Sequence, residues 1–241
     1  MENVLITKKL FSYLKKGSLK DKDFLEHFLI PHLGLNNEIL NEQPKELSRF
    51  FGGGLQLKIW QYPNQFSSYL CHIGQKANNI KSYMEIGCRY GGTFITHCEY
   101  LEALGSDLKN KVAIDIIDEP EIISSYVRHS SGVEFVKLDS SSDEFINFIE
   151  KKFFDLVFID GDHSYDGVKR DAENTRSISN IQVFHDIVNS ACPGVVEYWN
   201  ELKNNFSDVY YFHEFIDQYP SVDGTYLGIG VATRKEWINV I

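Results

Sequence analysis

The polar side chains that could perform chemistry are concentrated in two short stretches of the second half of the chain. The denser one, IDGDHSYDGVKRD at 159–171, follows directly on an apolar run, and the other is FHD at 184–186. Carboxylates and an imidazole that converge at one point can hold a divalent cation and leave positions open for a substrate. The candidate ligands are Asp160, His185 and Asp186.

The same polar residues also have an ordinary structural explanation. Asp162 would cap a helix that begins at His163, and Asp186 would cap a turn. Against this, buried carboxylates need a counter-charge, because without one they would be neutralised by protonation. Both explanations stay open on the sequence alone.

A third stretch whose residues could take part in chemistry is SYMEIGCRYGGT, residues 82–93. A short apolar strand ends there in an acidic residue and glycines, and a helix follows, so a ligand could approach bare backbone at the helix N-terminus. The spacing is Glu85-x-Gly87-x-Arg89-x-Gly91-Gly92, which departs from the dinucleotide fingerprint G-x-G-x-x-G because an arginine replaces its second glycine. A structural turn without a ligand is the alternative.

The elements that must position these residues alternate along the chain. Seven strands are expected, separated at first by helices, and this alternation predicts a parallel sheet with helices on both faces. The last two strands are joined without a helix, which predicts an antiparallel pair. The expected strands are 83–86, 111–117, 133–138, 154–159, 181–184, 208–213 and 225–232, and the expected helices between them are 93–104, 120–128, 142–150, 163–175 and 193–204.

With these elements, residues 80–232 resemble the class I S-adenosylmethionine-dependent methyltransferases. The resemblance implies a Rossmann-like, doubly wound α/β fold with a mostly parallel seven-stranded sheet and a reversed last strand. It also implies that the glycine loop faces the methionine end of the cofactor, that Asp115 binds the ribose hydroxyls, and that Asp139 with Ser140 lies by the adenine. The loop residues concerned are Glu85, Gly87, Arg89 and Gly91.

A narrower resemblance rests on F-I-D-G-D-H-S-Y-D-G-V-x-x-D, followed by F-H-D and by P-G-V-x-x-Y-W. These motifs are similar to those of the cephalosporin-hydroxylase-like and macrolide-sugar O-methyltransferases. In that branch, and in catechol O-methyltransferases, magnesium sits on residues that correspond to Asp160, His185 and Asp186. The branch often has an acid at the position of His185, so manganese or another borderline cation stays open as an alternative to magnesium.

The implied activity is O-methylation of a hydroxyl on a small molecule or sugar-bearing natural product, with S-adenosylmethionine as donor. A cation on the acceptor would lower the pKa of its hydroxyl, and Asp160 or His163 would serve as general base. Two alternatives stay open: a nicotinamide-dependent oxidoreductase, and a binding protein that shares the fold without catalysis.

The first 79 residues are expected to form a helical extension on the acceptor side of a core at 80–241. Amphipathic helices over 4–17 and 21–30, the second ended by Pro31, would cover the core or a second copy in a homo-oligomer. Gln61 and Gln65, four residues apart, would lie over the cofactor or acceptor if helical; the alternative is that they belong to the start of a packed helix.

Composition narrows the partners. A formal net charge of −10 argues against nucleic acid, whose phosphates select basic surfaces. The N-terminus lacks a signal-peptide apolar region, and no apolar run approaches the roughly 20 residues of a membrane span, so a cytoplasmic protein is expected. The four cysteines contain no C-x-x-C and are expected to be reduced and packed as small apolar side chains, with Cys88 the one placed to touch a ligand.

Overall fold

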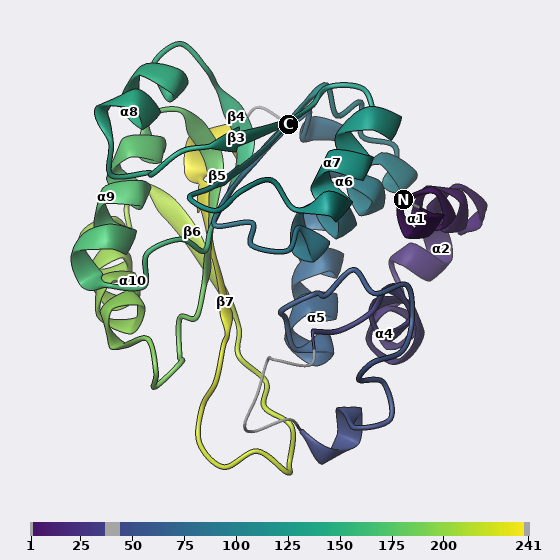
Figure 1. Ribbon diagram of the computed structural model, residues 1–241. Coiled ribbons are helices and arrows are strands. Elements are labelled where there is room, and N and C mark those ends of the chain that lie inside the picture. The colour runs from purple at the N-terminus through teal and green to yellow at the C-terminus, as the bar shows by residue number, and fades with distance from the viewer. Residues whose placement is uncertain (1, 37–43, 239–241) are drawn as a thin grey trace.

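The computed structural model describes residues 2–36 and 44–238. At its centre is a seven-stranded sheet with helices on both faces (Figure 1). The strand order is β3-β2-β1-β4-β5-β7-β6. The strands are β1 (Ser82–Ile86), β2 (Asn110–Asp115), β3 (Val133–Lys137), β4 (Phe154–Ile159), β5 (Ser179–His185), β6 (Tyr210–Phe215) and β7 (Ile229–Arg234).

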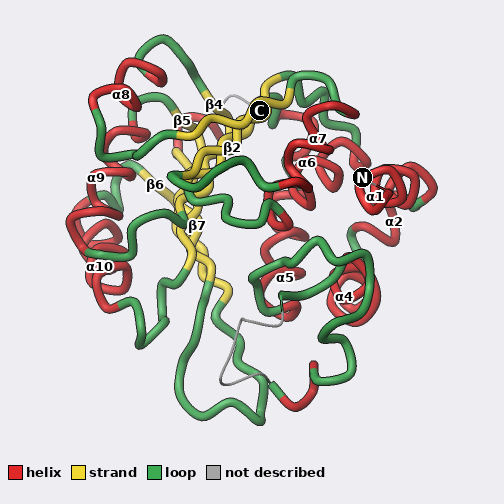
Figure 2. Tube along the Cα trace, viewed as in Figure 1, coloured by secondary structure: helices red, strands yellow, loops and turns green. Residues whose placement is uncertain are grey.

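The direction of the strands follows the expected pattern. Strands β1 to β5 are parallel, and β7 pairs antiparallel with both β5 and β6. The prediction of a mostly parallel sheet with a reversed last strand is therefore confirmed. The loop 216–228 that joins β6 to β7 extends away from the sheet (Figure 2), and Ser221 accepts a hydrogen bond from the backbone N–H of Lys45.

The sheet order changes direction at β1. The chain first builds outward from β1 through β2 to β3, then returns to place β4 on the other side of β1. In open α/β sheets, ligands bind at the carboxyl ends of the strands at such a point, because the connecting loops diverge there and leave a crevice. The topology therefore places the crevice above Ile86 and Ile159, which end the two central strands.

The two faces of the sheet carry separate apolar clusters, and the side chains of β1 alternate between them: Tyr83 packs into one and Met84 into the other. None of the described helices is long and apolar enough to cross a bilayer. Helices α8 (Asp143–Ile149), α9 (Tyr165–Arg176) and α10 (Pro193–Asn205) cover one face, and α5 (Pro63–Gly74), α6 (Gly92–Leu104) and α7 (Glu121–His129) cover the other (Figure 1).

The N-terminal helices pack on the second of these faces. Val4 and Phe11 are buried in the same apolar cluster as Tyr83, and α1 contacts α6 and α7. The division at residue 79 stays a prediction. The N-terminal helical elements are α1 (Glu2–Tyr13), α2 (Lys16–Leu19), α3 (Lys22–Phe24), η1 (Leu25–Leu29) and α4 (Ile30–Leu33), and the other short ones are η3 (Lys45–Leu47), η4 (Ala77–Asn79) and α11 (Lys235–Ile238).

The expectation that Pro31 ends the second helix is wrong. Helical structure continues through it to Leu33, and Gly34, with φ +107°, is where it stops. The preceding turn is a π-helix, in which the N–H of Ile30 bonds to the carbonyl of Leu25. A proline inside a helix removes one backbone hydrogen bond and crowds the preceding turn, and the π-turn lies directly before it here.

Candidate active site

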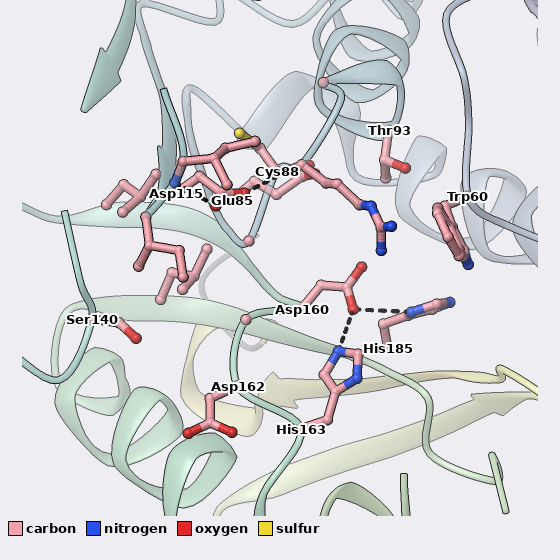
Figure 3. A pocket seen from close by; sticks show the side chains of 18 of the residues that line it. Trp60, Glu85, Cys88, Thr93, Asp115, Ser140, Asp160, Asp162, His163 and His185 are labelled. Atoms are coloured by element: carbon pink, nitrogen blue, oxygen red, sulfur yellow. Dashed lines mark hydrogen bonds and ion pairs between the residues drawn. The ribbon is translucent and has the colours of Figure 1, made fainter. Parts of the chain in front are cut away.

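A cavity of about 800 Å³ opens at the carboxyl ends of β1, β2, β4 and β5. Nearly all of the residues expected from the sequence to form a site line it (Figure 3). These residues could be predicted to lie together because the carboxyl ends of parallel strands meet at one edge of the sheet. The expected residues that line the cavity are Glu85, Gly87, Arg89, Gly91, Asp115, Asp139, Ser140, Asp160, His163, His185 and Asp186.

The glycine loop and the end of β4 are in direct backbone contact. The N–H of Asp160 donates to the carbonyl of Ile86 at 2.9 Å. Gly87 has φ +84°, and a Cβ at this position would lie 2.0 Å from the carbonyl oxygen of Asp160. Only glycine allows this approach, so the loop fixes where the Asp160 side chain enters the cavity.

Arg89 occupies the loop in a left-handed conformation, with φ +44°. This conformation is uncommon for a residue with a side chain. Its contacts include a hydrogen bond from its backbone N–H to Oδ2 of Asp115 at 2.6 Å, and its guanidinium carbon lies 3.8 Å from the centroid of the Trp60 ring. The second contact is a cation–π interaction, and it brings the segment before α5 to the rim of the cavity.

The carboxylates at the ends of β2 and β3 are oriented by backbone groups. Oδ1 of Asp115 accepts from the N–H of Ile117 at 3.2 Å. Oδ1 of Asp139 accepts from the N–H of Ser141 at 2.8 Å, and hydrogen bonding by Ser141 lowers the pKa of the Asp139 carboxyl. Both are therefore fixed acceptors at the edge of the cavity.

Glu85 contributes a buried carboxylate. Its residue is 1% exposed, and the hydroxyl of Tyr83 donates to Oε2. Burial raises the pKa of Glu85 well above its usual value, because the charged form has lost water. A cationic group on a ligand would supply the missing counter-charge.

The end of β4 and the end of β5 form the polar centre of the site. Oδ1 of Asp160 lies 3.2 Å from Nε2 of His163 and 3.1 Å from Nδ1 of His185 (Figure 3). Oδ2 of Asp186 lies 3.5 Å from Nδ1 of each histidine. Asp186 has φ +64°, and its Oδ1 accepts from the amide of Asn189 at 2.7 Å.

These groups shift one another's protonation. Burial lowers the pKa of His185, but the charges of Asp160 and Asp186 outweigh burial and raise it to about 10. Hydrogen bonds to Asp160 and Cys192 raise the pKa of His163 to about 11. Burial opposes ionisation of Asp186, but the neighbouring His185 lowers its pKa well below the usual range. At neutral pH the cluster holds two imidazolium ions against two carboxylates.

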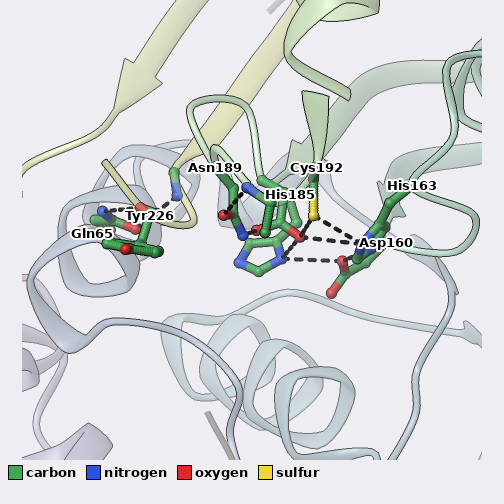
Figure 4. Close-up of polar contacts among 10 residues, drawn as sticks. Gln65, Asp160, His163, His185, Asn189, Cys192 and Tyr226 are labelled. Atoms are coloured by element: carbon green, nitrogen blue, oxygen red, sulfur yellow. Dashed lines mark hydrogen bonds and ion pairs between the residues drawn. The ribbon is translucent and has the colours of Figure 1, made fainter. Parts of the chain in front are cut away.

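Cys192 was expected only to pack as a small apolar side chain, yet its thiol belongs to this cluster. Its Sγ lies 3.2 Å from Nδ1 of His163 and 3.5 Å from Oδ2 of Asp186 (Figure 4). The only signal was a cysteine directly before a proline, shortly after the strand that ends in His185. Cys88, which was expected to touch a ligand, lines the cavity and is buried, and burial raises its pKa.

Gln65 lies apart from the other expected residues. It is 1% exposed, sits on α5 outside the cavity lining, and is engaged with the β6–β7 loop (Figure 4). Its Nε2 donates to the carbonyl of Asp217 at 2.9 Å, and its Oε1 accepts from the N–H of Gly228 at 2.9 Å. Gln61 precedes α5, so the two glutamines do not share a helical face. The amide of Gln65 is used by the protein's own backbone.

In the described part of the chain, two groups of three side chains lie close enough together to hold a metal ion. One is Asp160, His185 and Asp186, and the other is His163, Asp186 and Cys192. Within each group the candidate ligand atoms lie within 4.8 Å of one another. Asp186 belongs to both groups.

Comparisons with known proteins agree with this fold. Residues 84–187 match the family described as Methyltransferase domain. No curated protein matches the chain. The O-methyltransferase TomG from Streptomyces achromogenes, solved in complex with S-adenosylmethionine, is 14% identical; the alignment covers 87% of this chain and 95% of that one, with a TM-score of 0.53.

Two further solved structures share the fold. Cofactor-bound Rv0187 from MTB is 12% identical, and the alignment covers 75% of this chain and 83% of that one, with a TM-score of 0.52. The MycE methyltransferase of the mycinamycin biosynthetic pathway, solved with Mg and S-adenosylhomocysteine, is 15% identical over 73% of this chain and 48% of that one, with a TM-score of 0.50. Residues 84–187 therefore match a methyltransferase domain, and the chain shares its fold with S-adenosylmethionine-dependent methyltransferases of known structure.

Proposed function

We propose that the protein is an S-adenosylmethionine-dependent O-methyltransferase that acts on a hydroxyl of a small molecule or a sugar-bearing natural product with the help of a divalent cation. The observation that carries this proposal is the continuity of one cavity. It runs from the buried carboxylate of Glu85 and the oriented carboxylate of Asp115 to the cluster around Asp160. A methyl donor and an acceptor can therefore meet in a single space.

The donor half of the cavity suits the parts of S-adenosylmethionine. Glu85 offers a buried carboxyl group, whose charged form the methionine ammonium would stabilise, and the backbone from Gly87 to Gly91 offers close approach. Asp115 accepts hydrogen bonds from the ribose hydroxyls, while Asp139 and Ser140 lie beside the adenine. Arg89 supports the arrangement by donating its backbone N–H to Asp115. Gln65 has no part in the proposal.

The residues of the acceptor half fit a divalent cation. Asp160, His185 and Asp186 offer one nitrogen and two oxygens. Carboxylate oxygens are the ligands that magnesium and manganese prefer, and an imidazole nitrogen is a ligand that transition metals prefer. The 3.1 Å between Oδ1 of Asp160 and Nδ1 of His185 is close to the ~3 Å edge expected between ligands of an octahedral ion. Such a cation, when bound, lowers the pKa of an acceptor hydroxyl.

A proton acceptor lies beside that position. The His163 side chain is 41% exposed and faces Asp160 through Nε2, so either residue can take the proton of an acceptor hydroxyl that enters from solvent. For His163 this requires the neutral ring, which a cation on Asp160 and Asp186 would favour by neutralising the two carboxylates that hold the proton. The transferred methyl is already activated in the sulfonium, so alignment of the hydroxyl supplies most of the rate.

Known structures support the proposal without deciding it. TomG was solved with S-adenosylmethionine, and MycE with Mg and S-adenosylhomocysteine. The nicotinamide alternative fits less well, since the antiparallel β7 and the arginine in the glycine loop both depart from the dinucleotide-binding pattern.

Two measurements test the proposal. Titration calorimetry should show binding of S-adenosylhomocysteine and none of NADH; binding of NADH alone would refute the proposed cofactor. The protein should then convert S-adenosylmethionine to S-adenosylhomocysteine in the presence of a panel of catechols and hydroxylated glycosides, with manganese but not with excess chelator. Full turnover in chelator would refute the role of the cation.

A further inference from the structure

We propose that His163, Asp186 and Cys192 form a second metal site, which takes a thiophilic divalent ion such as Zn²⁺. The first candidate group offers only nitrogen and oxygen ligands, whereas this one adds a cysteine sulfur. Thiolate and imidazole ligands select zinc and related transition metals, while magnesium keeps to oxygen. The second site is therefore chemically different from the first, and it does not depend on the proposed methyl transfer.

The spacing of the three ligand atoms matches one face of a tetrahedron. With zinc bonds of about 2.3 Å to sulfur and about 2.0–2.2 Å to nitrogen and oxygen, tetrahedral ligands lie about 3.4–3.6 Å apart. Here Sγ of Cys192 is 3.2 Å from Nδ1 of His163 and 3.5 Å from Oδ2 of Asp186, and the last pair is 3.5 Å apart. An ion can bind above these three atoms with shifts of a few tenths of an ångström.

The backbone around the three ligands holds them in place. The first turn of α10 abuts the segment before α9: a Cβ on Gly194 would lie 2.2 Å from the backbone nitrogen of Tyr165. This contact brings Cys192 close to His163. Asn189 completes the arrangement, because its side chain donates to Oδ1 of Asp186 and its carbonyl accepts from the N–H of Cys192 at 2.9 Å. A ligand carboxylate oriented by such a partner is typical of metal sites.

The site is enclosed but reachable. Asp186 and Cys192 are 3% and 8% exposed, whereas the side chain of His163 is 41% exposed. The three ligands therefore leave a fourth tetrahedral position toward the cavity for water or a ligand group. Closed structural zinc sites use four protein ligands, whereas this site has three and keeps one coordination position open.

The two metal sites compete for one carboxylate. Oδ2 of Asp186 lies 3.5 Å from Nδ1 of His185 in the first group and 3.5 Å from Nδ1 of His163 in the second. A zinc ion that draws this oxygen and His163 toward Cys192 removes a ligand from the first site and the proposed base from Asp160. Zinc would therefore weaken manganese binding, and manganese would weaken zinc binding by the same factor. This consequence, unlike the site itself, rests on the proposed catalytic cation.

Cobalt substitution tests the site directly. Co²⁺ bound to a thiolate gives a charge-transfer absorption in the near ultraviolet, and we expect one such band to saturate at one equivalent in the wild-type protein. Cys192→Ser should lose the band, and His163→Gln should weaken cobalt binding at least tenfold. Cys71→Ser is the matched control. Cys71 is more exposed than the three buried cysteines and lies on α5, away from the proposed ligands, so its removal should leave the band unchanged.

A further variant separates the two metal sites. Asp160→Asn removes a ligand of the first group only, so the cobalt–thiolate band should persist while manganese binding, followed by electron paramagnetic resonance, is lost. Absence of the band in the wild type, or its survival in Cys192→Ser, would overturn the second site, as would its loss in Asp160→Asn with the far-ultraviolet circular dichroism unchanged. Failure of manganese to bind any variant would instead count against the proposed catalytic cation alone.

Discussion

Oδ1 of Asp160 and Nδ1 of His185 face each other at 3.1 Å across the neighbouring strands β4 and β5. Burial lowers the pKa of His185, but the charges of Asp160 and Asp186 outweigh burial and raise it to about 10, against an ordinary value of about 6.5. A pKa raised by folding stabilises the protein fully below the unfolded value, and this stabilisation is lost as the pH rises through the folded value.

The free energy of unfolding should therefore depend on pH in a definite direction. In the presence of chelator we expect it to fall by on the order of 2 kcal/mol between pH 6 and pH 9, measured by urea denaturation. His185→Gln should reduce this dependence but not abolish it, because the pKa of His163 is raised as well. Substitution of the exposed His32 by glutamine should leave it unchanged. A stability that is constant or rises over this range would show that the ion pair does not form.

Asp115→Ala tests the position of the cofactor. Loss of an oriented carboxylate that accepts ribose hydroxyls should weaken S-adenosylhomocysteine binding by about 1.5–3 kcal/mol, measured by titration calorimetry. The matched control is Asp118→Ala, because Asp118 lies three residues further on, and its exposed side chain pairs with Lys137 outside the cavity lining. Equal affinities of Asp115→Ala and the wild type would move the ribose to another part of the cavity.

Asp186→Ala tests the catalytic cation. The variant should lose manganese binding and methyl transfer yet keep its affinity for S-adenosylhomocysteine, since the proposed cofactor contacts lie on β1 to β3. Asp208→Ala, a substitution at an exposed site before β6, should change neither. Because His185 must release its proton to bind the ion, manganese affinity in the wild type should weaken as the pH falls below about 10. An affinity independent of pH would exclude His185 as a ligand.

Phe11→Ala tests whether the N-terminal helices are part of the folding unit. Phe11 is 2% exposed within the apolar cluster that covers one face of the sheet, so its truncation should cost about 3–5 kcal/mol in a single cooperative transition. Tyr13→Ala on the same helix removes a side chain that is 76% exposed and should change stability by less than about 0.5 kcal/mol. Two separate transitions in Phe11→Ala would indicate that the helices fold independently of the sheet.

Much of the fold and of the candidate site could be predicted because both follow from local patterns. Each central strand is an apolar run that ends in or near a carboxylate, and parallel strands bring those ends to one edge. This is why Asp115, Asp139 and Asp160 were expected together and line one cavity. The reversed last strand was predictable because no helix pattern separates the last two apolar runs.

The parts that sequence reasoning missed depend on how distant segments dock. The contact of Cys192 with His163 exists because Gly194 lets α10 approach the start of α9, and no local pattern encodes that distance. Gln65 was expected at the cofactor, but its amide is bound by the β6–β7 loop, about 150 residues away in the sequence. The continuation of the helix through Pro31 after a π-turn was also missed, because proline by itself predicts a helix end.

The close approach of Gly87 to the carbonyl of Asp160 has a consequence for how the substrate range of the proposed methyltransferase could change. Because two backbones touch there, the spacing between the donor loop and the end of β4 is set by the main chain, and side-chain substitutions cannot adjust it. New acceptors would have to be accommodated by the segments that border the cavity from outside the sheet, such as the one carrying Lys58 and Trp60. Variation for substrate range is therefore best directed there, with the glycine loop left intact.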